Sequence, residues 1–149
     1  MNRKELLIEA WKQTINVQIH FNDIEMKIRN IAISVLTATW VAAFYNYGKG
    51  PAIQVCCFHL TLSQILCFVG LVAWISFYLM DALWYHRLLL GAVLHGMDME
   101  KKYAMKYPEL MLSTRITKES MFGHVRSSGK INLFYGLLAI VQIVGIVLL

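Results

Sequence analysis

The residues whose types and spacing could do chemistry follow one helical face in the middle of the chain. On a helical wheel this face carries Asp81, Trp84, Arg87, Gly91, His95 and Asp98. Ionisable residues that begin at a membrane boundary mark ion or proton pathways by default. In a ring of such helices, Asp81, Arg87, His95 and Asp98 would line a vestibule and influence the passage of ions. The alternative is a set of salt bridges, such as Asp81 with Arg87 of a neighbouring copy, that holds the helices together.

Other reactive side chains form weaker patterns. Cys56, Cys57 and His59 lie close together, but an adjacent cysteine pair with one histidine does not match the spacing of zinc ligands. The cysteines, Cys67 included, are better explained as buried small hydrophobic residues. The sequence also lacks the His-Glu-x-x-His, Gly-x-Ser-x-Gly and Cys-x-x-Cys motifs and a P-loop. We therefore expect no enzyme activity, no metal and no other cofactor.

The composition points to a membrane protein. Of 149 residues, 58% are hydrophobic and only 15% are charged, whereas soluble domains are about 25% charged. Three stretches contain no Asp, Glu, Lys or Arg: residues 30–48, 50–80 and 131–149. Because about 20 apolar residues cross a bilayer as a helix, we predict spans at residues 31–47, 62–80 and 131–149. The last segment would also suit a hydrophobic helix packed inside an oligomer.

The distribution of Lys and Arg predicts the orientation. Of the 14 basic residues, five precede the first span, one lies between the first two spans, and eight lie between Arg87 and Lys130. The positive-inside rule then places the N-terminus and residues 81–130 in the cytoplasm. The net charge of +5 is explained by this topology and by attraction to anionic lipid. Because acidic residues interrupt the basic ones, we expect no direct binding of nucleic acid.

The sequence predicts two long helices. Residues 1–30 form an amphipathic cytoplasmic helix whose apolar stripe alternates three- and four-residue steps, which is typical of a helix that faces a partner. The stripe comprises Leu7, Ala10, Thr14, Val17, Phe21, Ile24, Ile28 and Ile31. No Pro or Gly precedes Gly48, so this helix is predicted to continue into the first span as a rod of about 40 residues or ~60 Å; the alternative is a helix lying flat on lipid.

The second span is predicted to continue in the same way as a second long helix. No proline occurs between its start and Tyr107, so the helix should end before Pro108. A tight turn at residues 48–51 would make the two long helices an antiparallel hairpin. Residues 108–130 then connect to the last span through one short helix.

Small residues in the first span predict close helix packing. Ser34, Ala38 and Ala42 recur at four-residue intervals, a spacing that lets helix backbones approach in lipid. This contact could lie within one chain or between copies. Three spans and a long apolar cytoplasmic stripe leave little internal core, which favours a homo-oligomer.

Two motifs resemble a known family. The run Trp84-Tyr85-His86-Arg87-Leu88-Leu89-Leu90-Gly91, followed by Val93, His95 and Gly96, and the later Lys130-Ile131-Asn132 with Phe134-Tyr135 resemble the RipA-like family of small octameric bacterial membrane proteins. That family includes the membrane accessory proteins of type VI-B CRISPR RNA-targeting nucleases. The resemblance implies an octameric ring in the inner membrane with a cytoplasmic vestibule and a central pore.

In the CRISPR-linked members, the implied role is antiviral: the pore perturbs the membrane after the nuclease recognises phage RNA. The chain departs from those members because it lacks the closely spaced Arg and His of HEPN-type ribonucleases. Arg87 with His95 and Arg115 with His124 are too widely spaced for that signature.

Taken together, these features predict an all-α integral membrane protein with one helical membrane domain over residues 1–149. A long helical hairpin projects into the cytoplasm beside a C-terminal hydrophobic helix, and the chains assemble as a homo-oligomeric ring in the bacterial inner membrane. The expected function is that of a pore-like effector or accessory protein in antiviral defence. The alternatives are a non-conducting scaffold or adaptor and, less favoured, a small proton-coupled transporter that depends on Asp81. The expected partners are copies of the chain, membrane lipid and, functionally, an RNA-guided nuclease system.

Overall fold

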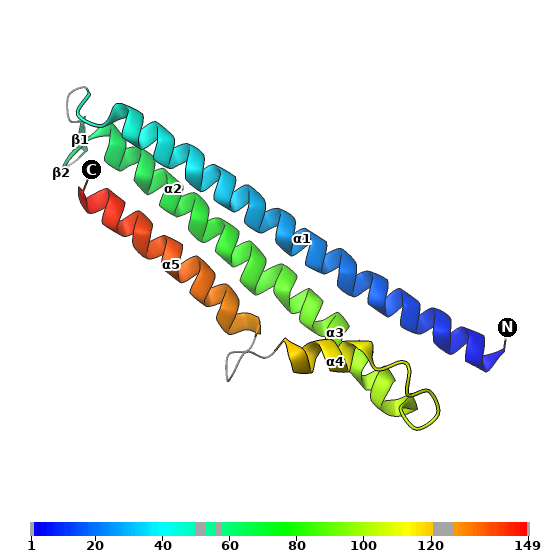
Figure 1. Ribbon diagram of the computed structural model, residues 1–149. Helices are drawn as coiled ribbons and strands as arrows, with labels where there is room; N and C mark the ends of the chain where they lie inside the picture. The colour runs from blue at the N-terminus through cyan, green and yellow to red at the C-terminus, as the bar shows by residue number, and fades with distance from the viewer. Residues whose placement is uncertain (1, 50–52, 56–57, 121–126, 149) are drawn as a thin grey trace. The chain divides into compact units, whose positions relative to one another are not determined.

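The protein is almost entirely helical (Figure 1). The computed structural model describes residues 2–49, 53–55, 58–120 and 127–148. Its elements, in chain order, are α1 (Arg3–Asn46), β1 (Ile53–Val55), β2 (Phe58–Leu60), α2 (Leu62–Tyr78), the π-helix η1 (Leu79–Tyr85), α3 (His86–Tyr103), α4 (Leu112–Glu119) and α5 (Ser127–Leu148). The helical fold class is confirmed. The sequence did not predict the short antiparallel pair of β1 and β2, in which Ile53 lies opposite Leu60.

Three continuous helices are long and apolar enough to span a bilayer: residues 3–46, 62–103 and 127–148. The first confirms that the N-terminal segment and the first predicted span share one helix. The second confirms that the helix of the second span continues and ends before Pro108, because α2, η1 and α3 follow one another without a gap. The predicted short connecting helix is α4. The three candidate spans agree with a membrane protein.

The predicted turn after the first span begins where expected. Gly48 has φ +69°, a left-handed conformation that glycine adopts without the steric cost that a Cβ brings. Its position two residues after the end of α1 explains why the helix stops there. Gly50 and Pro51, the other half of the predicted turn, lie outside the described residues.

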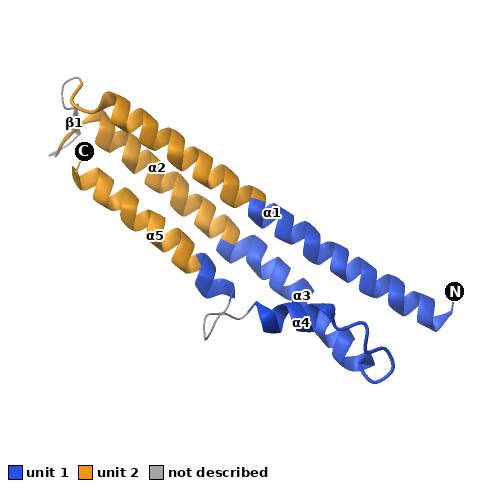
Figure 2. Cartoon of the chain, in the orientation of Figure 1, with its two compact units in different colours: residues 1–26, 82–131 blue, residues 27–81, 132–149 orange. Residues whose placement is uncertain are grey.

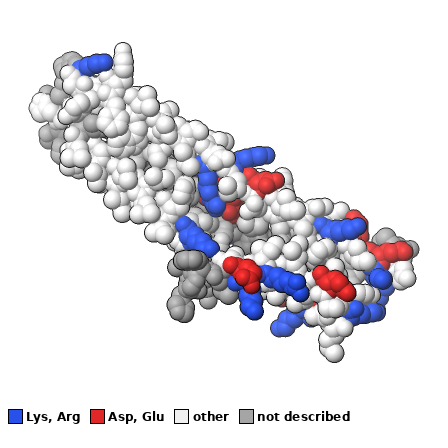
Figure 3. Space-filling model, viewed as in Figure 1, with Lys and Arg blue, Asp and Glu red and all other residues white. Residues whose placement is uncertain are grey.

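The chain divides into two compact units (Figure 2). Unit 1 comprises residues 1–26 and 82–131, and unit 2 comprises residues 27–81 and 132–149. The charged residues of unit 2 are Lys27, Arg29, Lys49 and Asp81, and the charged side chains in Figure 3 gather mainly over unit 1. Unit 2 therefore contains the predicted spans, and unit 1 contains most of the predicted cytoplasmic segment.

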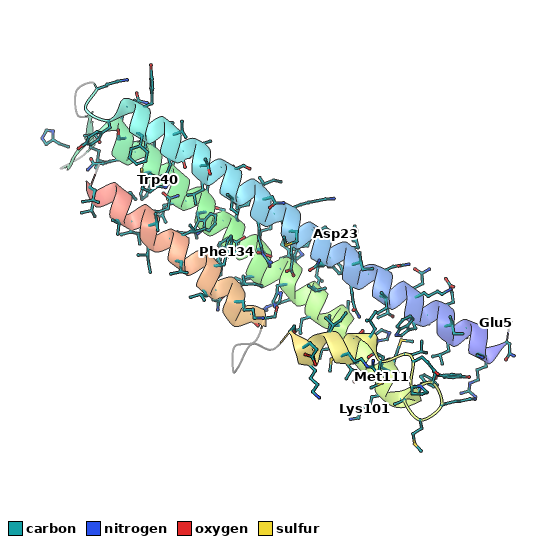
Figure 4. All side chains as sticks on the ribbon, in the orientation of Figure 1. Glu5, Asp23, Trp40, Lys101, Met111 and Phe134 are labelled. Atoms are coloured by element: carbon teal, nitrogen blue, oxygen red, sulfur yellow. The ribbon has the colours of Figure 1, made fainter. Side chains whose placement is uncertain are left out.

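Unit 2 is held together by close helix contacts and by hydrogen bonds that satisfy buried polar groups. The Ser63 hydroxyl donates to the Ala43 carbonyl at 2.9 Å, and the Trp74 indole donates to the Tyr135 carbonyl at 3.0 Å. The ring of Phe134 (labelled in Figure 4) lies 5.7 Å from that of Trp74. In lipid, such packing and hydrogen bonding replace the hydrophobic drive between helices. The Gln142 amide is an exception, because it is buried without a hydrogen-bond partner among the described residues.

The inward stripe of α1 differs from the predicted one. Leu7, Thr14, Phe21 and Ile28 are buried or half-buried, as predicted, and Ile24 is half-buried too. Ala10, Val17 and Ile31 are exposed, so the prediction was wrong for them. Their inward places are taken by Trp11, Gln18 and Ala32, each one position further along, and Glu25, beside Ile24, is buried as well. A search for apolar residues selects the wrong positions because Gln18 and Glu25 are polar and find partners inside.

We predict that Gly70→Ala weakens the packing of unit 2. A Cβ at Gly70 would lie 2.6 Å from Thr39 Oγ1 and 3.1 Å from Thr39 Cβ, and the β-branched Thr39 has little rotamer freedom in a helix. We expect a loss of about 1–3 kcal/mol, measured by SDS titration of detergent-solubilised protein with tryptophan fluorescence. Gly136→Ala is the matched control, because a Cβ there meets nothing within 4 Å. Equal stability of both variants would contradict the prediction.

Candidate functional site

A buried ion pair joins the three helices of unit 2. Arg29 of α1 donates to both carboxylate oxygens of Asp81, from Nε at 2.7 Å and from Nη2 at 3.2 Å. The Tyr135 hydroxyl of α5 donates to Asp81 Oδ2 at 3.1 Å. The Asp81 side chain is 0% exposed, whereas that of Arg29 is 23% exposed. The carboxylate is therefore neutralised by a two-pronged guanidinium contact and further satisfied by a phenol.

This arrangement is suited to holding helices in register. Removing a carboxylate from water costs several kcal/mol, which a single ion partner offsets only with good geometry and further hydrogen bonds. Asp81 has both, so sliding α1 along η1 would leave a buried charge without its partner. This pair has a structural role and not a reactive one, because each carboxylate oxygen of Asp81 already accepts a hydrogen bond.

A second buried pair lies in unit 1. His86 Nδ1, at the start of α3, lies 3.2 Å from Glu25 Oε1 of α1, and both side chains are less than a tenth exposed. The other ring nitrogen, Nε2 of His86, is buried and has no hydrogen-bond partner among the described residues. A histidine bound to a carboxylate through Nδ1 has a fixed ring orientation. Glu25 and His86 therefore fix how α1 packs against the start of α3.

The second polar centre of unit 1 is Glu100, which caps α4. Its carboxylate accepts from the backbone N–H of Ser113 at 2.7 Å and of Thr114 at 2.8 Å, and from the Thr114 hydroxyl at 2.8 Å. The indole of Trp11 approaches the same carboxylate at 3.4 Å. These backbone groups belong to the first turn of α4, where N–H groups lack helical partners. A carboxylate from α3 thus performs the capping role that Met111, just before α4, does not.

The pKa of Glu100 reflects two opposing effects. Burial of the carboxylate raises its pKa, but the hydrogen bonds from Thr114 and Ser113 outweigh burial and leave the pKa below its ordinary value. The contact of α4 with α3 is also close at Gly96, where a Cβ would lie 2.7 Å from the Ser113 hydroxyl. Glu100 and Gly96 together position the start of α4.

The structure separates Asp81 from the other predicted vestibule residues. Arg87, His95 and Asp98 are exposed on α3, and Gly91 between them is open, whereas Asp81 is fully buried. The physical reason is the π-helix η1, whose turns hold about one more residue than α-helical turns. A wheel drawn with one period across residues 81–98 therefore misplaces Asp81 relative to the rest. The lining of a passage by the three exposed residues stays a prediction.

None of the three predicted packing residues of the first span is buried in the part of the chain that the structure describes. Ser34 and Ala38 are exposed and Ala42 is half-buried. The hydroxyl of Ser34 donates to Asn30 in its own helix. Of the two alternatives for this stripe, contact between copies therefore stays a prediction, while the close contacts inside unit 2 use Ala32 and Ala43, which are buried instead.

Sequence reasoning missed several functional partners. Arg29 was not singled out from the sequence, and Tyr135 and His86 were named only within the two motifs of the family resemblance. One signal was available: Arg29 and Asp81 each border a span on the side predicted to be cytoplasmic, so they lie at the same depth. Cys56 and Cys57, at which the sequence predicts no zinc site, lie outside the described residues. Cys67 is buried, as expected from the sequence.

Comparison of the chain with family models, curated proteins and solved structures gave no match.

We predict that Asp81→Asn strongly destabilises unit 2. The amide keeps the shape of the side chain but removes the negative charge that Arg29 contacts through two nitrogens, and breaking a buried pair costs about 3–5 kcal/mol. The measurement is SDS titration of purified protein. Asp98→Asn, at an exposed position, should change stability by no more than about 0.5 kcal/mol. Replacing both partners, as Arg29→Met with Asp81→Leu, should recover part of the loss; a double variant no better than Asp81→Asn would contradict a paired role.

We predict that α4 detaches from α3 as the pH falls. A carboxylate whose folded pKa is lowered stabilises the fold above its unfolded pKa, and this contribution is lost as the pH falls towards the folded pKa. The protection factors of the Ser113 and Thr114 amides, which are their exchange rates relative to an unstructured chain at the same pH, should therefore fall on acidification below the ordinary pKa of Glu. Glu100→Gln should show low protection at these amides already at neutral pH, while Glu9→Gln, exposed on α1, should behave like the parent. Protection factors at the two amides that do not change with pH would refute the capping role.

Proposed function

We propose that this chain is an integral membrane protein of the bacterial inner membrane that works as a homo-oligomer, with the exposed polar face of α3 lining a water-filled vestibule of a pore-like assembly. Its N-terminus and unit 1 lie in the cytoplasm in this proposal, as the distribution of Lys and Arg favours. The observation that carries the proposal is the surface of α3. Arg87, His95 and Asp98 share this exposed surface with the open Gly91.

Charges on this face are free to act on solvent or ions. Neither Arg87 nor Asp98 lies within 4 Å of an opposite charge in the part of the chain that the structure describes. Large apolar side chains stand beside them, with Leu90 and Leu94 of α3 45% and 52% exposed. Mixed surfaces of this kind fit a contact between copies that leaves a polar path, because the leucines can be covered while the charges stay wet.

The membrane part supports self-association from another direction. Ser34 and Ala38 form a small-residue face on α1 that is exposed in the single chain. Helices associate in lipid through such faces because small side chains let the backbones approach closely. A neighbouring copy is the partner that this proposal assigns to the face.

A second candidate function is a non-conducting scaffold. The exposed Leu83, Leu90 and Leu94 favour it, because they would plug the axis of an assembly if they pointed towards it. A proton-coupled transporter is less well supported, since Asp81 is already bonded to Arg29 and Tyr135. The antiviral role implied by the family resemblance belongs to the pore proposal and would require an RNA-guided nuclease to trigger it.

We predict a closed ring of about eight chains for the detergent-purified protein, measured by light scattering and electron-microscopy class averages. Ala38→Leu should reduce the oligomer, because the larger side chain holds the backbones apart. In liposomes, Arg87→Gln should change ion conductance while the oligomer stays intact.

Each of these two variants has a matched control. Thr37→Leu adds a similar side chain at an exposed position beside the small-residue face and should assemble normally. Arg115→Gln removes one charge from an exposed position of α4 and should conduct like the parent. A monomer or dimer would exclude the pore, a ring without conductance would support the scaffold, and loss of assembly in Arg87→Gln would assign Arg87 to an ion pair between copies.

A further inference from the structure

A cavity of about 340 Å³ in unit 1 lies between the beginning of α1 and the end of α3. Its lining includes Arg3, Lys4 and Leu7 from α1, Tyr103 from α3, and Lys106 and Tyr107 from the turn that follows. The backbone N–H groups of Lys106 and Tyr107 both donate to the Tyr103 carbonyl, at 3.0 and 2.9 Å. This turn fixes the two residues beside the start of α1. The volume falls in the range of small-molecule sites, about 300–1,000 Å³.

The cavity concentrates positive charge. Arg3, Lys4 and Lys106 line it, and no carboxylate does. Within the described ranges, no Asp or Glu forms an ion pair with these three side chains. The nearby Glu5 carboxylate accepts instead from the backbone N–H of Asn2 at 3.0 Å. Convergent cations without counter-charges raise the local positive potential and attract anions.

The tyrosines add a second kind of contact. The ammonium groups of Lys4 and Lys106 lie 5.8 and 5.6 Å from the centre of the same ring, that of Tyr107. Each distance suits a cation–π contact. Because both ammonium groups approach the same ring, their like charges also repel each other. An anion between them would remove this repulsion. The half-buried rings of Tyr103 and Tyr107, with Leu7, meanwhile offer an apolar surface to a flat group.

The geometry points to a site for a nucleoside diphosphate or triphosphate. Arg3 would bind phosphate oxygens in the two-pronged manner typical of guanidinium groups, and Lys4 and Lys106 would add point charges. The base would stack on a tyrosine ring, a contact that tolerates any base. The cavity takes one nucleotide, and the basic residues elsewhere alternate with acidic ones, so a free nucleotide fits better than a nucleic-acid strand. This inference is independent of the proposed pore.

The site would couple ligand binding to structure. The two sides of the cavity come from segments about a hundred residues apart in sequence, residues 2–7 and 103–107. A ligand that binds both sides stabilises their contact by RT ln(1 + c/Kd), where c is the ligand concentration, and this term grows with the logarithm of c above Kd. Nucleotide binding should therefore slow amide exchange in the first turns of α1.

The experiment is isothermal titration of the full-length, detergent-purified protein with ADP, ATP, AMP, adenosine and pyrophosphate, without divalent cations that would compete for phosphate. Saturable binding of ADP and ATP is expected, with AMP about tenfold weaker and adenosine not binding. Such a ratio is the expected effect of losing one charge-assisted contact, because tenfold corresponds to about 1.4 kcal/mol. Pyrophosphate should also be weaker than ADP because it lacks the base. Equal affinity for pyrophosphate and ADP would overturn the nucleotide assignment.

Two triple variants complete the test. The first removes the three cations of the cavity (Arg3→Gln, Lys4→Gln and Lys106→Gln) and should weaken ADP binding at least tenfold. A separate single variant, Tyr107→Leu, should weaken the binding of ADP more than the binding of pyrophosphate. The second triple variant is the control and removes the same charge from exposed positions outside the cavity: Lys12→Gln, Lys101→Gln and Arg115→Gln. Lys101 is labelled in Figure 4. This control should bind like the parent. Equal losses in both triple variants would show attraction by net charge alone and overturn the site, as would tighter binding of a single-stranded oligonucleotide than of ADP.

Discussion

The constraint on which unit 2 depends is that a carboxylate hidden from water needs a counter-charge at its own depth. Asp81 is fully buried, so α1 must place Arg29 opposite it and α5 must place the Tyr135 hydroxyl beside it. The three helices also meet through apolar and small side chains, which tolerate sliding because one apolar neighbour is much like another in lipid, and through a few neutral hydrogen bonds such as those of Ser63 and Trp74. An ion pair does not tolerate sliding, since a displaced partner leaves a desolvated charge. The pair therefore selects one register among several that packing alone would accept.

Unit 1 applies the same principle with different groups. Its interior contains Thr14, Glu25, His86, Glu100 and Ser113, and these residues are bonded to one another or to backbone. Directional bonds of this kind specify which helix faces which, although they contribute less free energy than their number implies, because each replaces a bond to water. The polar interior also has a consequence for the surface of unit 1. With polar groups inside, apolar residues such as Val17, Leu90 and Leu94 remain exposed and are available for contacts with other copies.

The long helices could be predicted from the sequence, but the residues that each helix turns inward could not. Charge-free stretches and the positions of Gly48 and Pro108 sufficed for the long helices, because a bilayer accepts little else. The inward stripe of α1 failed at Gln18 and Glu25, since a polar residue is inward only when a partner exists elsewhere in the chain, and a single helix does not reveal partners. Asp81 was misplaced for a different reason: the wheel assumed one helical period, and η1 changes that period between Asp81 and Arg87. No local pattern in Leu79–Tyr85 marks a π-helix.

The π-helix lets one continuous helix serve two purposes. Within it, Asp81 is turned inward, where Arg29 neutralises its charge; after it, α3 turns Arg87, His95 and Asp98 outward. The outward charges are therefore not needed to neutralise Asp81. Nor can they face lipid, because Arg and Asp exposed to hydrocarbon are costly. The exposed leucines Leu90 and Leu94 lie beside them, so the surface of α3 mixes charged and apolar side chains. The proposed assembly of several copies would cover the leucines and leave the charges in water.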